Sequence, residues 1–337
     1  FLLYKTPLVF LFDYQGICIT ILILGTLLYA LINYQIITYV FDMVRTSKLY
    51  EEHYVDPQNV ELEFKEKRNL IHIYLESVEN TYLSKEDGGQ EENNYIKELG
   101  YDCYEVDGKE LVEKTAEIKD AVEKTKVPVT TACNGYRGWI GDFIEERRLN
   151  GVTDLKEILR CIAEVGGTGV VIPAAWGMFT FRLPPHVPPR SHEGDIKAIM
   201  DSLKELDPVA RQYGVYIYLE PLNQYQDHML NLQSQAREII DNGKFTNVKT
   251  TCDFYHMNRE EDNISQALRE SKDYIGHVHI ADNQRYQPGS GSIDFKKHFD
   301  TLKEIGYDGP IIFEGRLRGD PVEVCKESSA FVKECLK

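Results

Sequence analysis

Four apolar stretches of the sequence each end on a side chain that can bind a metal ion. The stretches "VYIYLE", "VKTTCD", "GHVHIA" and "IIFEG" carry Glu220, Asp253, His279 and Glu314 at or near their ends. Three carboxylates and one imidazole suit a hard or borderline divalent ion such as Mn²⁺, Mg²⁺ or Co²⁺. Zinc is compatible with this set, although the lack of a cysteine in it removes the commonest form of structural zinc site.

Each of these residues taken alone has a simpler explanation. A carboxylate at the end of a strand is usually solvated or caps the next helix, and a single histidine is often a hydrogen-bonded core residue. Four consecutive strands that all end in this way are a different observation. In a parallel barrel the active site lies at the carboxyl ends of the strands. The sequence therefore predicts that the four side chains meet at one rim of a barrel.

The elements that would position these side chains alternate regularly from Gly100 onward. Seven strand-like segments are "YDCYEV", "VPVTTA", "GVVIPA", "VYIYLE", "VKTTCD", "IGHVHIA" and "PIIFEG". The helix-like segments that follow them lie near 108–125, 153–165, 195–213, 232–242, 261–271, 294–305 and 320–336. This alternation predicts an α/β fold with a parallel sheet covered by helices. An open doubly wound sheet is the rival, but no GxGxxG motif follows the first strand.

An eighth strand is needed to close a (β/α)8 TIM barrel without an open edge. The segment 69–75, within "NLIHIYLES", has the right length, and Leu70, Ile71 and Ile73 suit burial on both faces. We predict that it takes the first-strand position, because an unpaired parallel edge invites aggregation. Glu76 would then reach the same rim as the four candidate ligands, and we expect no catalytic role for it.

The N-terminal part of the sequence differs from the rest. Residues 1–41 are hydrophobic, and "GICITILILGTLLYALI" (16–32) carries no charge. This length predicts a membrane-spanning helix, with a buried core helix as the alternative. Residues 42–68 are polar and predict a linker, and 69–337 predict one TIM-barrel domain. The expected localisation is cytoplasmic for the barrel, with a membrane anchor at its N-terminal side.

Net charge and cysteine content indicate which classes of partner and which kinds of cross-link the chain is expected to lack. The formal net charge of the 337 residues is −16, which argues against a nucleic-acid partner, because such surfaces are normally basic. Seven cysteines occur without a CxxC pair, which predicts reduced thiols in place of a disulfide framework.

From about residue 95 to the C-terminus the chain resembles the sugar phosphate isomerase/epimerase group of xylose isomerase-like TIM barrels. The likeness is greatest to D-tagatose/D-psicose 3-epimerases and hydroxypyruvate isomerase, through "YLEPLN", "CDFYHMN", "GHVHIADNQR", "PGSGSIDF" and "IFEG". The resemblance implies one divalent metal ion, Mn²⁺ foremost, with Glu220, Asp253, His279 and Glu314 as its ligands. It also implies that His256 and Arg285 contact the substrate.

One position departs from this pattern. Epimerases of the group often carry a Glu six residues after the first ligand, in contact with the substrate, and this chain has Gln226 there. Glutamine keeps hydrogen-bonding capacity but cannot take up a proton. We therefore expect the metal chemistry to persist and the choice of sugar to differ.

The residue types imply a reaction at a carbon next to a carbonyl group. A bound metal ion polarises the carbonyl and acidifies the adjacent C–H, and Glu220 can remove that proton as a general base. Glu314 can return a proton to the opposite face, which gives epimerisation. Return to the neighbouring carbon gives isomerisation. The expected substrate is a ketose or related sugar-like ketone, and a homo-oligomer is compatible with the sequence. A lyase of the inosose dehydratase type and a non-functional chimeric fusion are the alternatives.

A second resemblance covers about residues 1–99. The segment "KLYEEHYVDPQNVELEFKEKRNLIHIYLESVENTYLSKEDGG" is similar to the membrane-to-catalytic junction of lipoteichoic acid synthase-type phosphoglycerol transferases. Glu76 matches one metal ligand of that family, but its catalytic threonine and later ligands have no counterpart here. The resemblance implies a chimeric chain whose transferase part is inactive.

Overall fold

The computed structural model describes residues 25–26, 29, 96, 99–177 and 188–337, and the structural statements below concern these residues. The chain divides into two compact units, 1–69 and 70–337, and three helical residues of the first are described. None of the helices in the described part is long and apolar enough to cross a membrane. Apart from those three residues, the predicted span at 16–32 lies outside the described residues, as do the linker at 42–68 and the strand at 69–75.

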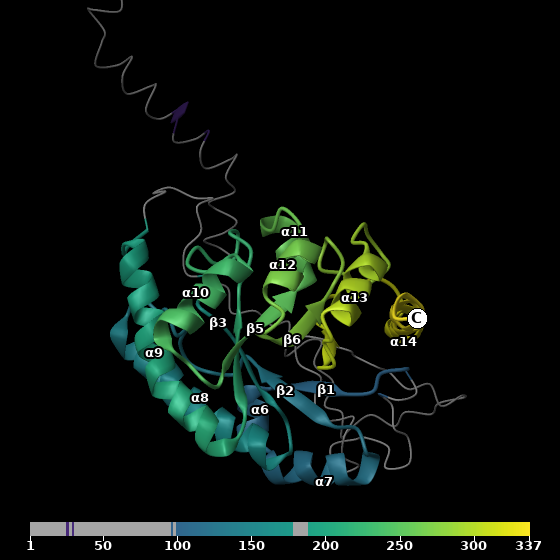
Figure 1. Cartoon of the computed structure of the whole chain (residues 1–337), viewed down its shortest axis with the longest axis horizontal. Helices are drawn as coiled ribbons and strands as arrows, with labels where there is room; N and C mark the ends of the chain where they lie inside the picture. The colour runs from purple at the N-terminus through teal and green to yellow at the C-terminus, as the bar shows by residue number, and fades with distance from the viewer. Residues whose placement is uncertain (1–24, 27–28, 30–95, 97–98, 178–187) are drawn as a thin grey trace, which may run out of the picture. The chain divides into compact units, whose positions relative to one another are not determined.

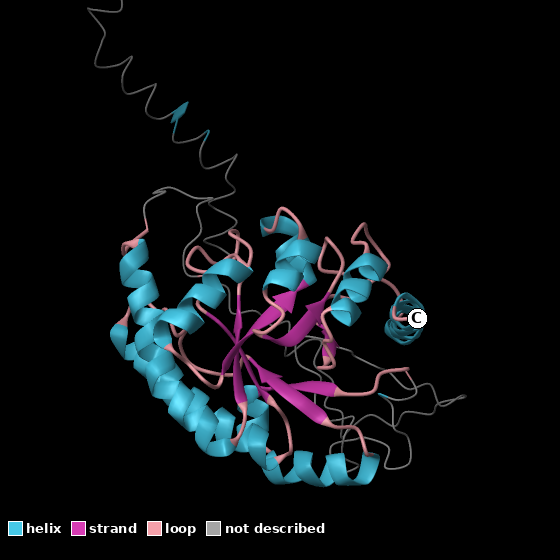
Figure 2. Cartoon of the chain, viewed as in Figure 1, coloured by secondary structure: helices cyan, strands magenta, loops and turns pink. Residues whose placement is uncertain are grey.

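Seven parallel strands form one sheet in which neighbours in sequence are neighbours in space. Figure 2 shows them radiating from a common centre, with the helices in an arc outside. This is the barrel arrangement that the alternation of elements predicted. The strands are β1 (Tyr104–Asp107), β2 (Val129–Cys133), β3 (Gly169–Pro173), β4 (Tyr216–Glu220), β5 (Val248–Asp253), β6 (Ile275–Ile280) and β7 (Ile311–Phe313).

The helices follow the strands around the barrel (Figure 1). They are α6 (Gly108–Glu113), α7 (Thr115–Thr125), α8 (Glu145–Glu164), α9 (His192–Tyr213), α10 (Gln233–Gly243), α11 (Phe254–Glu260), α12 (Ile264–Glu270), α13 (Phe295–Glu304) and α14 (Pro321–Cys335). Among the helices before β3, two differ from the sequence-based prediction. The stretch 108–125 breaks at Lys114, whose φ of −128° is not helical, and α8 begins earlier than expected.

Local sequence explains why these elements form. All residues of β3 are buried, as expected for a parallel strand covered on both faces. Helix α9 begins at Ser191, whose side chain accepts a hydrogen bond from Gly194 N, and ends at Gly214 with a φ of 71°. Its buried face, which includes Ile199 and Leu203, packs into the core between helices and strands. The barrel is thus held by apolar contacts outside the sheet, which leaves its interior free for polar groups.

The two ends of the sheet are β1 and β7. In the described part of the chain no strand pairs with the outer edge of either. A cavity of about 380 Å³ lies between them and is lined mainly by apolar groups, among them Val106 of β1, Ile311 of β7, Val332 of α14 and Leu336 just after α14. The proposed first strand, 69–75, would occupy this seam between β1 and β7, and it remains a proposal because it lies outside the described residues.

Thiols are distributed through the barrel. The described cysteines are free, and Cys161 and Cys252 have no exposed surface. Cys133 and Cys325 lie at the seam. Burial raises the pKa of the Cys133 and Cys252 thiols well above the usual value, and raises that of Cys325 to about 11. At neutral pH these groups are therefore unreactive while the barrel stays closed.

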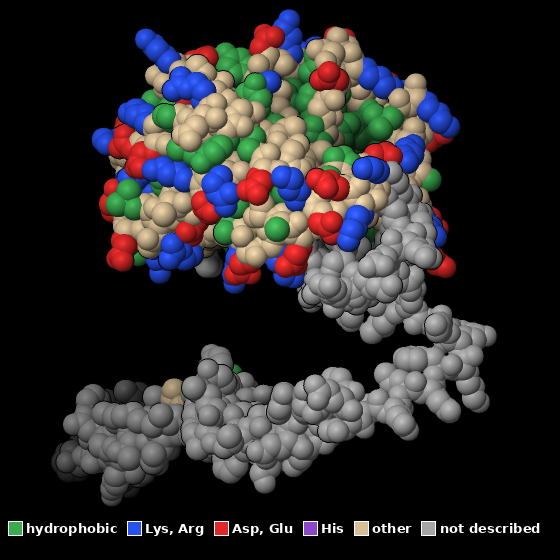
Figure 3. Space-filling view, turned by 90° about the horizontal axis from the view of Figure 1, so that it is seen from below, with side chains coloured by type: hydrophobic (Ala, Val, Ile, Leu, Met, Phe, Trp, Pro, Cys, Tyr) green, Lys and Arg blue, Asp and Glu red, His purple; other side chains and the backbone are tan. Residues whose placement is uncertain are grey.

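The surface carries charges of both signs. On the face shown in Figure 3, Lys and Arg side chains alternate with Asp and Glu. Many form pairs one helical turn apart, such as Lys296 with Asp300 at 2.9 Å in α13. Exposed pairs of this kind contribute little to stability individually. The negative net charge is thus not gathered into one patch on this face.

A buried polar cluster anchors the turn that follows β4. His228 Nε2 lies 3.1 Å from Asp195 Oδ2, and Arg190 Nε lies 2.6 Å from Asp195 Oδ1. Arg190 also donates to the backbone carbonyls of Gly141 and Asp142. The cluster joins the first turn of α9 to the loops after β2 and β4. These loops all lie at the carboxyl end of the sheet, where the candidate ligands are.

Asp227 in this turn gives a stability prediction. Its Oδ1 accepts from Met229 N at 3.0 Å, its Oδ2 has no hydrogen-bond partner among the described residues, and burial raises its pKa to about 7. Because the folded-state pKa is raised, the contribution of this group to stability is lost as pH rises from about 4 to about 7. Asp227→Asn should remove that loss. The free energy of unfolding of the variant, relative to the native chain, should rise by roughly 1–3 kcal/mol over this range.

Urea unfolding at pH 4.5 and pH 8 measures the effect. Asp241→Asn, a change of the same type at an exposed position near the end of α10, is the control. A pH-independent difference for Asp227→Asn would show that the group is ionised in the folded protein.

Candidate active site

The four predicted ligands meet at one rim of the sheet. Glu220 ends β4, Asp253 ends β5, His279 lies in β6 and Glu314 follows β7. One atom from each lies within 4.8 Å of the atoms from the others. His279 Nδ1 is 3.1 Å from Glu220 Oε1, 2.8 Å from Glu314 Oε2 and 4.0 Å from Asp253 Oδ2. The structure therefore brings together residues that are far apart in the sequence: Glu220 and Glu314 are separated by 94 positions.

Backbone register explains the convergence. Asp253 and His279 are direct partners in the β5–β6 ladder, and Glu220 pairs with Pro173 at the end of β3. Glu314 N donates to Ile280 O at 3.1 Å, which holds the residue just beyond β7 against β6. Parallel strands in register present their last side chains at the same edge, so the sheet itself sets the spacing of the cluster.

Asp253 has two roles in the structure. Its Oδ1 accepts from Tyr255 N at 2.7 Å and from His256 N at 3.2 Å, which caps helix α11. Its Oδ2 faces the cluster and lies 2.5 Å from Arg285 Nη1. The sequence-based prediction placed the next helix at 261–271 and missed α11. An Asp at the N-cap followed directly by helix-compatible residues was the available signal. The cap fixes the carboxylate so that one oxygen remains for the site.

Arg285 lies between two of the carboxylates. Its Nη2 is 2.6 Å from Glu314 Oε2, its Nη1 contacts Asp253, and its guanidinium is 4.8 Å from the centre of the Tyr255 ring. The backbone of Arg285 has a φ of 62°, which a non-glycine residue rarely adopts. Asp282 holds this turn in place: Arg285 N donates to its carbonyl, and its carboxylate accepts from Gly291 N at 2.8 Å.

His256 is held as a neutral ring. Its Nδ1 faces Asn223 N at 2.9 Å and Asn223 Nδ2 at 2.8 Å, and both of these groups are donors. Nδ1 is therefore the acceptor, and the proton lies on Nε2, 3.8 Å from Asp253 Oδ2. Burial lowers the pKa of His256 to about 4. At neutral pH the ring can thus donate one hydrogen bond from Nε2 toward the site.

Gln226 lies in the turn after β4. A cavity of about 280 Å³ is lined by Gln226 with Asn223, Tyr225, Tyr255 and Arg259. Asn223 contacts His256, and Tyr255 lies under Arg285, so the cavity adjoins the cluster. Gln226 O accepts from Gly177 N at 2.8 Å, which links this turn to the loop after β3. The predicted substrate-contacting residues are therefore neighbours in space.

Burial and charge together separate the pKa values of the carboxyl groups. Burial raises the pKa of Glu220 to about 7, although hydrogen bonding and attraction to His279 oppose the shift. Burial also disfavours ionisation of Glu314, but Arg285 and His279 hold its pKa well below the usual value. The pKa of Asp253 is lowered by Arg285 and His256 against the same burial. Two glutamates whose environments separate their pKa values suit acid and base roles.

The donor set fits a divalent cation. Three carboxylates and an imidazole nitrogen surround one position, and oxygen-rich sets of this kind suit Mn²⁺ or Mg²⁺. Buried carboxylates this close together need positive charge among them. Arg285 supplies part of it, and without a metal ion His279 supplies more: burial opposes its protonation, but Glu105 and Glu314 hold its pKa well above the usual value. A bound cation would take the place of the proton on Nδ1.

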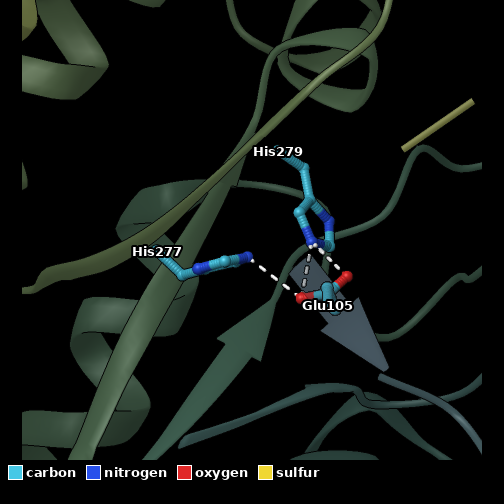
Figure 4. Close-up of side chains that lie close together, drawn as sticks. All are labelled: Glu105, His277 and His279. Atoms are coloured by element: carbon cyan, nitrogen blue, oxygen red, sulfur yellow. Dashed lines mark hydrogen bonds and ion pairs between the residues drawn. The ribbon is translucent and has the colours of Figure 1, made fainter. Parts of the chain in front are cut away.

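Two residues of the site were missed in the sequence. Glu105 from β1 and His277 from β6 lie against His279 on its other side (Figure 4). His277 and His279 are two positions apart in one strand, so they point to the same face of the sheet. That spacing was visible in "GHVHIA". Nothing local to "YDCYEV" shows that Glu105 faces the same interior.

Comparisons with known proteins agree with this geometry. A family model described as a xylose isomerase-like TIM barrel matches residues 94–335. The chain is 54% identical over 246 residues to 3-dehydro-D-guloside 4-epimerase of Escherichia coli strain K12, which covers 73% of this chain and 94% of the relative. It is 31% identical over 140 residues to a D-psicose 3-epimerase of Enterocloster bolteae, covering 40% of this chain and 46% of that relative.

A solved structure shows the same arrangement. The apo form of the E. coli 3-keto-D-glucoside 4-epimerase matches with a TM-score of 0.71 at 55% identity, over 72% of this chain and 92% of that one. These matches give no support to the resemblance of residues 1–99 to phosphoglycerol transferases.

Proposed function

The chain belongs to the xylose isomerase-like TIM barrel family and is an isomerase-class enzyme that acts on sugars, and from this premise we propose that it inverts a carbon next to a carbonyl group with the help of a divalent metal ion. The proposed substrate is a keto-glycoside with its carbonyl at C3, and the inverted carbon is C4. The name of the E. coli relative, at 54% identity, supports this choice. The convergence of the four side chains at one rim is the observation that carries the proposal.

The proposed metal ligands are Glu220, Asp253, His279 and Glu314, with Mn²⁺ as the first candidate. When bound, such an ion polarises the substrate carbonyl and acidifies the adjacent C–H. Glu220 and Glu314 approach the same His279 nitrogen from β4 and from the residue after β7. We propose that they act on opposite faces of a substrate carbon.

Proton transfer follows from this placement. One glutamate, as carboxylate, takes the proton from C4, and the electron pair of the C–H bond moves into an enediolate. The other glutamate, as carboxylic acid, returns a proton to the opposite face, which inverts the carbon. We propose Glu220 as the group that takes the proton and Glu314 as the group that returns one. In the reverse reaction the two roles exchange.

His256 and Arg285 are the proposed substrate-binding groups. His256 Nε2 can donate a hydrogen bond to a sugar oxygen, and Arg285 can stabilise negative charge that develops on the enediolate oxygens. Tyr255 backs Arg285 at 4.8 Å from the ring centre, which restricts where the guanidinium can move. Both residues thus act by orientation and charge, while the two glutamates move protons.

Isotope incorporation tests the proposal. The full chain, loaded with Mn²⁺, is incubated in D₂O with a 3-keto-glucoside, and the products are followed by NMR. We expect the C4 epimer with deuterium at C4, and loss of the reaction after chelation of the metal. Deuterium at a neighbouring carbon would indicate an isomerase, and loss of water would indicate a lyase. Absence of any exchange would overturn the proposed function.

Gln226 gives a prediction about substrate choice. Gln226→Glu should change the ratio of kcat/KM between a keto-glycoside and free ketoses such as D-fructose by at least about fivefold, because a hydrogen-bonding change at a substrate contact alters discrimination. The content of bound metal should stay unchanged. Gln224→Glu makes the same chemical change at a nearby exposed position and serves as the control. An unaltered ratio would mean that position 226 does not touch the substrate.

A further inference from the structure

The carboxylate of Glu105 lies on the far side of His279 from the other three carboxylates. Its Oε1 and Oε2 are 3.0 and 3.3 Å from His279 Nε2. The opposite ring nitrogen, Nδ1, faces Glu220 and Glu314. Figure 4 shows Glu105 approaching both His277 and His279 from β1. Carboxylates therefore contact both ring nitrogens of His279: Glu105 lies at Nε2, and Glu220 and Glu314 lie at Nδ1.

Glu105 is surrounded by hydrogen-bond donors. Thr131 Oγ1 donates to Oε2 at 2.6 Å, and His277 Nε2 lies 3.2 Å from the same oxygen. Thr131 and His279, from β2 and β6, therefore hydrogen-bond to one carboxylate that is 8% exposed. Thr131 is also the register partner of Glu105 in the β1–β2 ladder. The orientation of this carboxylate is thus fixed by the sheet.

A carboxylate at this place determines which nitrogen of His279 carries a proton. If Nε2 carried no proton, its lone pair would point at the Glu105 carboxylate, whose Oε1 lies 3.0 Å away. The lone pair and the negative oxygen would repel each other. With a proton on Nε2 the contact becomes a charge-assisted hydrogen bond. The lone pair of the neutral ring then lies on Nδ1 and faces Glu220 and Glu314, where a cation would bind. Partners of this kind commonly orient metal-binding histidines and increase their basicity.

We propose that Glu105 is a positioning residue that fixes the tautomer and ring orientation of His279 and so sets the affinity of the site for a divalent cation. His277 supports the arrangement. Its ring stacks on the Tyr218 ring, with 5.4 Å between the ring centres. It meets the His279 ring edge-on, with 4.7 Å between the ring centres. It therefore limits rotation of His279, and its Nε2 lies 3.2 Å from Glu105 Oε2. This inference rests on the metal site of the proposed function.

A second cation between Glu105, His277 and His279 is the alternative to positioning. Against it, His279 Nε2 lies 3.0 Å from Glu105 Oε1 in a direct hydrogen bond, and a nitrogen that donates a proton has no lone pair for a cation. Thr131 already occupies a further acceptor position on the same carboxylate. The geometry favours positioning over ligation.

Metal affinity and nitrogen NMR test the proposal together. In the full chain, Glu105→Gln keeps the shape of the side chain, but its amide group places N–H donors where one of the imidazole N–H groups now donates. The Kd for Mn²⁺, measured by chelator competition, should rise by about 10- to 100-fold. Glu110→Gln, five residues along in α6, is the matched control and should change the Kd less than about twofold. Thr131→Val should raise the Kd for Mn²⁺ by a smaller factor. This variant provides a second test of the proposal if Glu105→Gln does not fold.

The NMR arm uses protein with ¹⁵N-labelled histidine, after chelation and after loading with Mg²⁺. The Nε2–H of His279 should be observed as a downfield, slowly exchanging proton in the native chain and should shift upfield in Glu105→Gln. A native Kd retained in Glu105→Gln and Thr131→Val would overturn the proposal, as would a His279 proton on Nδ1 in the Mg²⁺-loaded protein. Two Mn²⁺ ions per chain, one of them lost in Glu105→Gln, would also overturn it.

The two proposals fail in different ways. If the native chain binds no Mn²⁺, the proposed function fails. The Nε2–H signal and its dependence on Glu105 would still support the positioning of His279 in that case, because this signal is read after chelation as well.

Discussion

Replacing Glu220 with Gln should lower turnover of the keto-sugar by a factor of at least about 10³, since a proton carrier and a proposed metal ligand are lost in one change. Glu220 ends β4 with 4% of its surface exposed, and its Oε1 lies 3.1 Å from His279 Nδ1. Glutamine fits the same space but cannot take or give the proton. Glu314→Gln should have a comparable effect, because inversion requires both groups.

Two measurements separate the causes of this loss. The Kd for Mn²⁺ reports the ligand role, and solvent deuterium exchange at saturating Mn²⁺ reports the proton-transfer role. Glu260→Gln, a change on α11 whose carboxylate accepts from Gln224 N at 2.8 Å, is the control and should leave turnover within about twofold. Near-native turnover in either Glu220→Gln or Glu314→Gln would remove the proposed mechanism.

A chain that begins at Asn93 should be markedly less stable and less soluble than one that begins at Lys67. We propose that segment 69–75 fills the seam between β1 and β7, where the described residues leave an apolar cavity of about 380 Å³. Burial of its apolar side chains would contribute on the order of 5 kcal/mol. Without it, two parallel strand edges are open to pairing with other chains.

Urea unfolding and light scattering compare the two chains. Ile73→Asp in the longer chain should reproduce much of the loss, because a charge would enter the seam. Glu76→Ala, just beyond the segment, should not. If the chain starting at Asn93 is as stable and as soluble as the longer one, then 69–75 does not pair with the sheet.

The order of strands and the four rim residues could be predicted because each signal is local. An apolar run that ends on a carboxylate or imidazole is visible in a few residues, and a parallel sheet brings such ends together whatever the details of packing. Asp253 and His279 illustrate this, as they are register partners. The choice of sugar is not local in the same way, because it depends on the shape of the cavity beside Gln226.

What the sequence did not show depends on long-range placement. Glu105 matters because β1 lies across the barrel interior from His279, 174 positions later in the chain. No motif records that contact. The turn at Arg285 is similar: its φ of 62° is imposed by the hydrogen bonds of Asp282, and the residue type alone gives no hint of it. The first feature follows from the curvature of the sheet, which brings β1 and β6 to face each other, and the second from the turn after β6.

The buried thiols of the barrel have a practical consequence. A protected thiol reacts with an alkylating reagent only when its surroundings open, so each cysteine reports the opening free energy of its own neighbourhood. Cys133 and Cys325 lie at the seam, whereas Cys161 in α8 and Cys252 in β5 lie fully buried in separate core clusters. Pulsed alkylation read by mass spectrometry would therefore rank the regions by local stability, without any label being introduced. Labelling of Cys325 ahead of Cys161 would identify the seam as the part of the barrel that opens first.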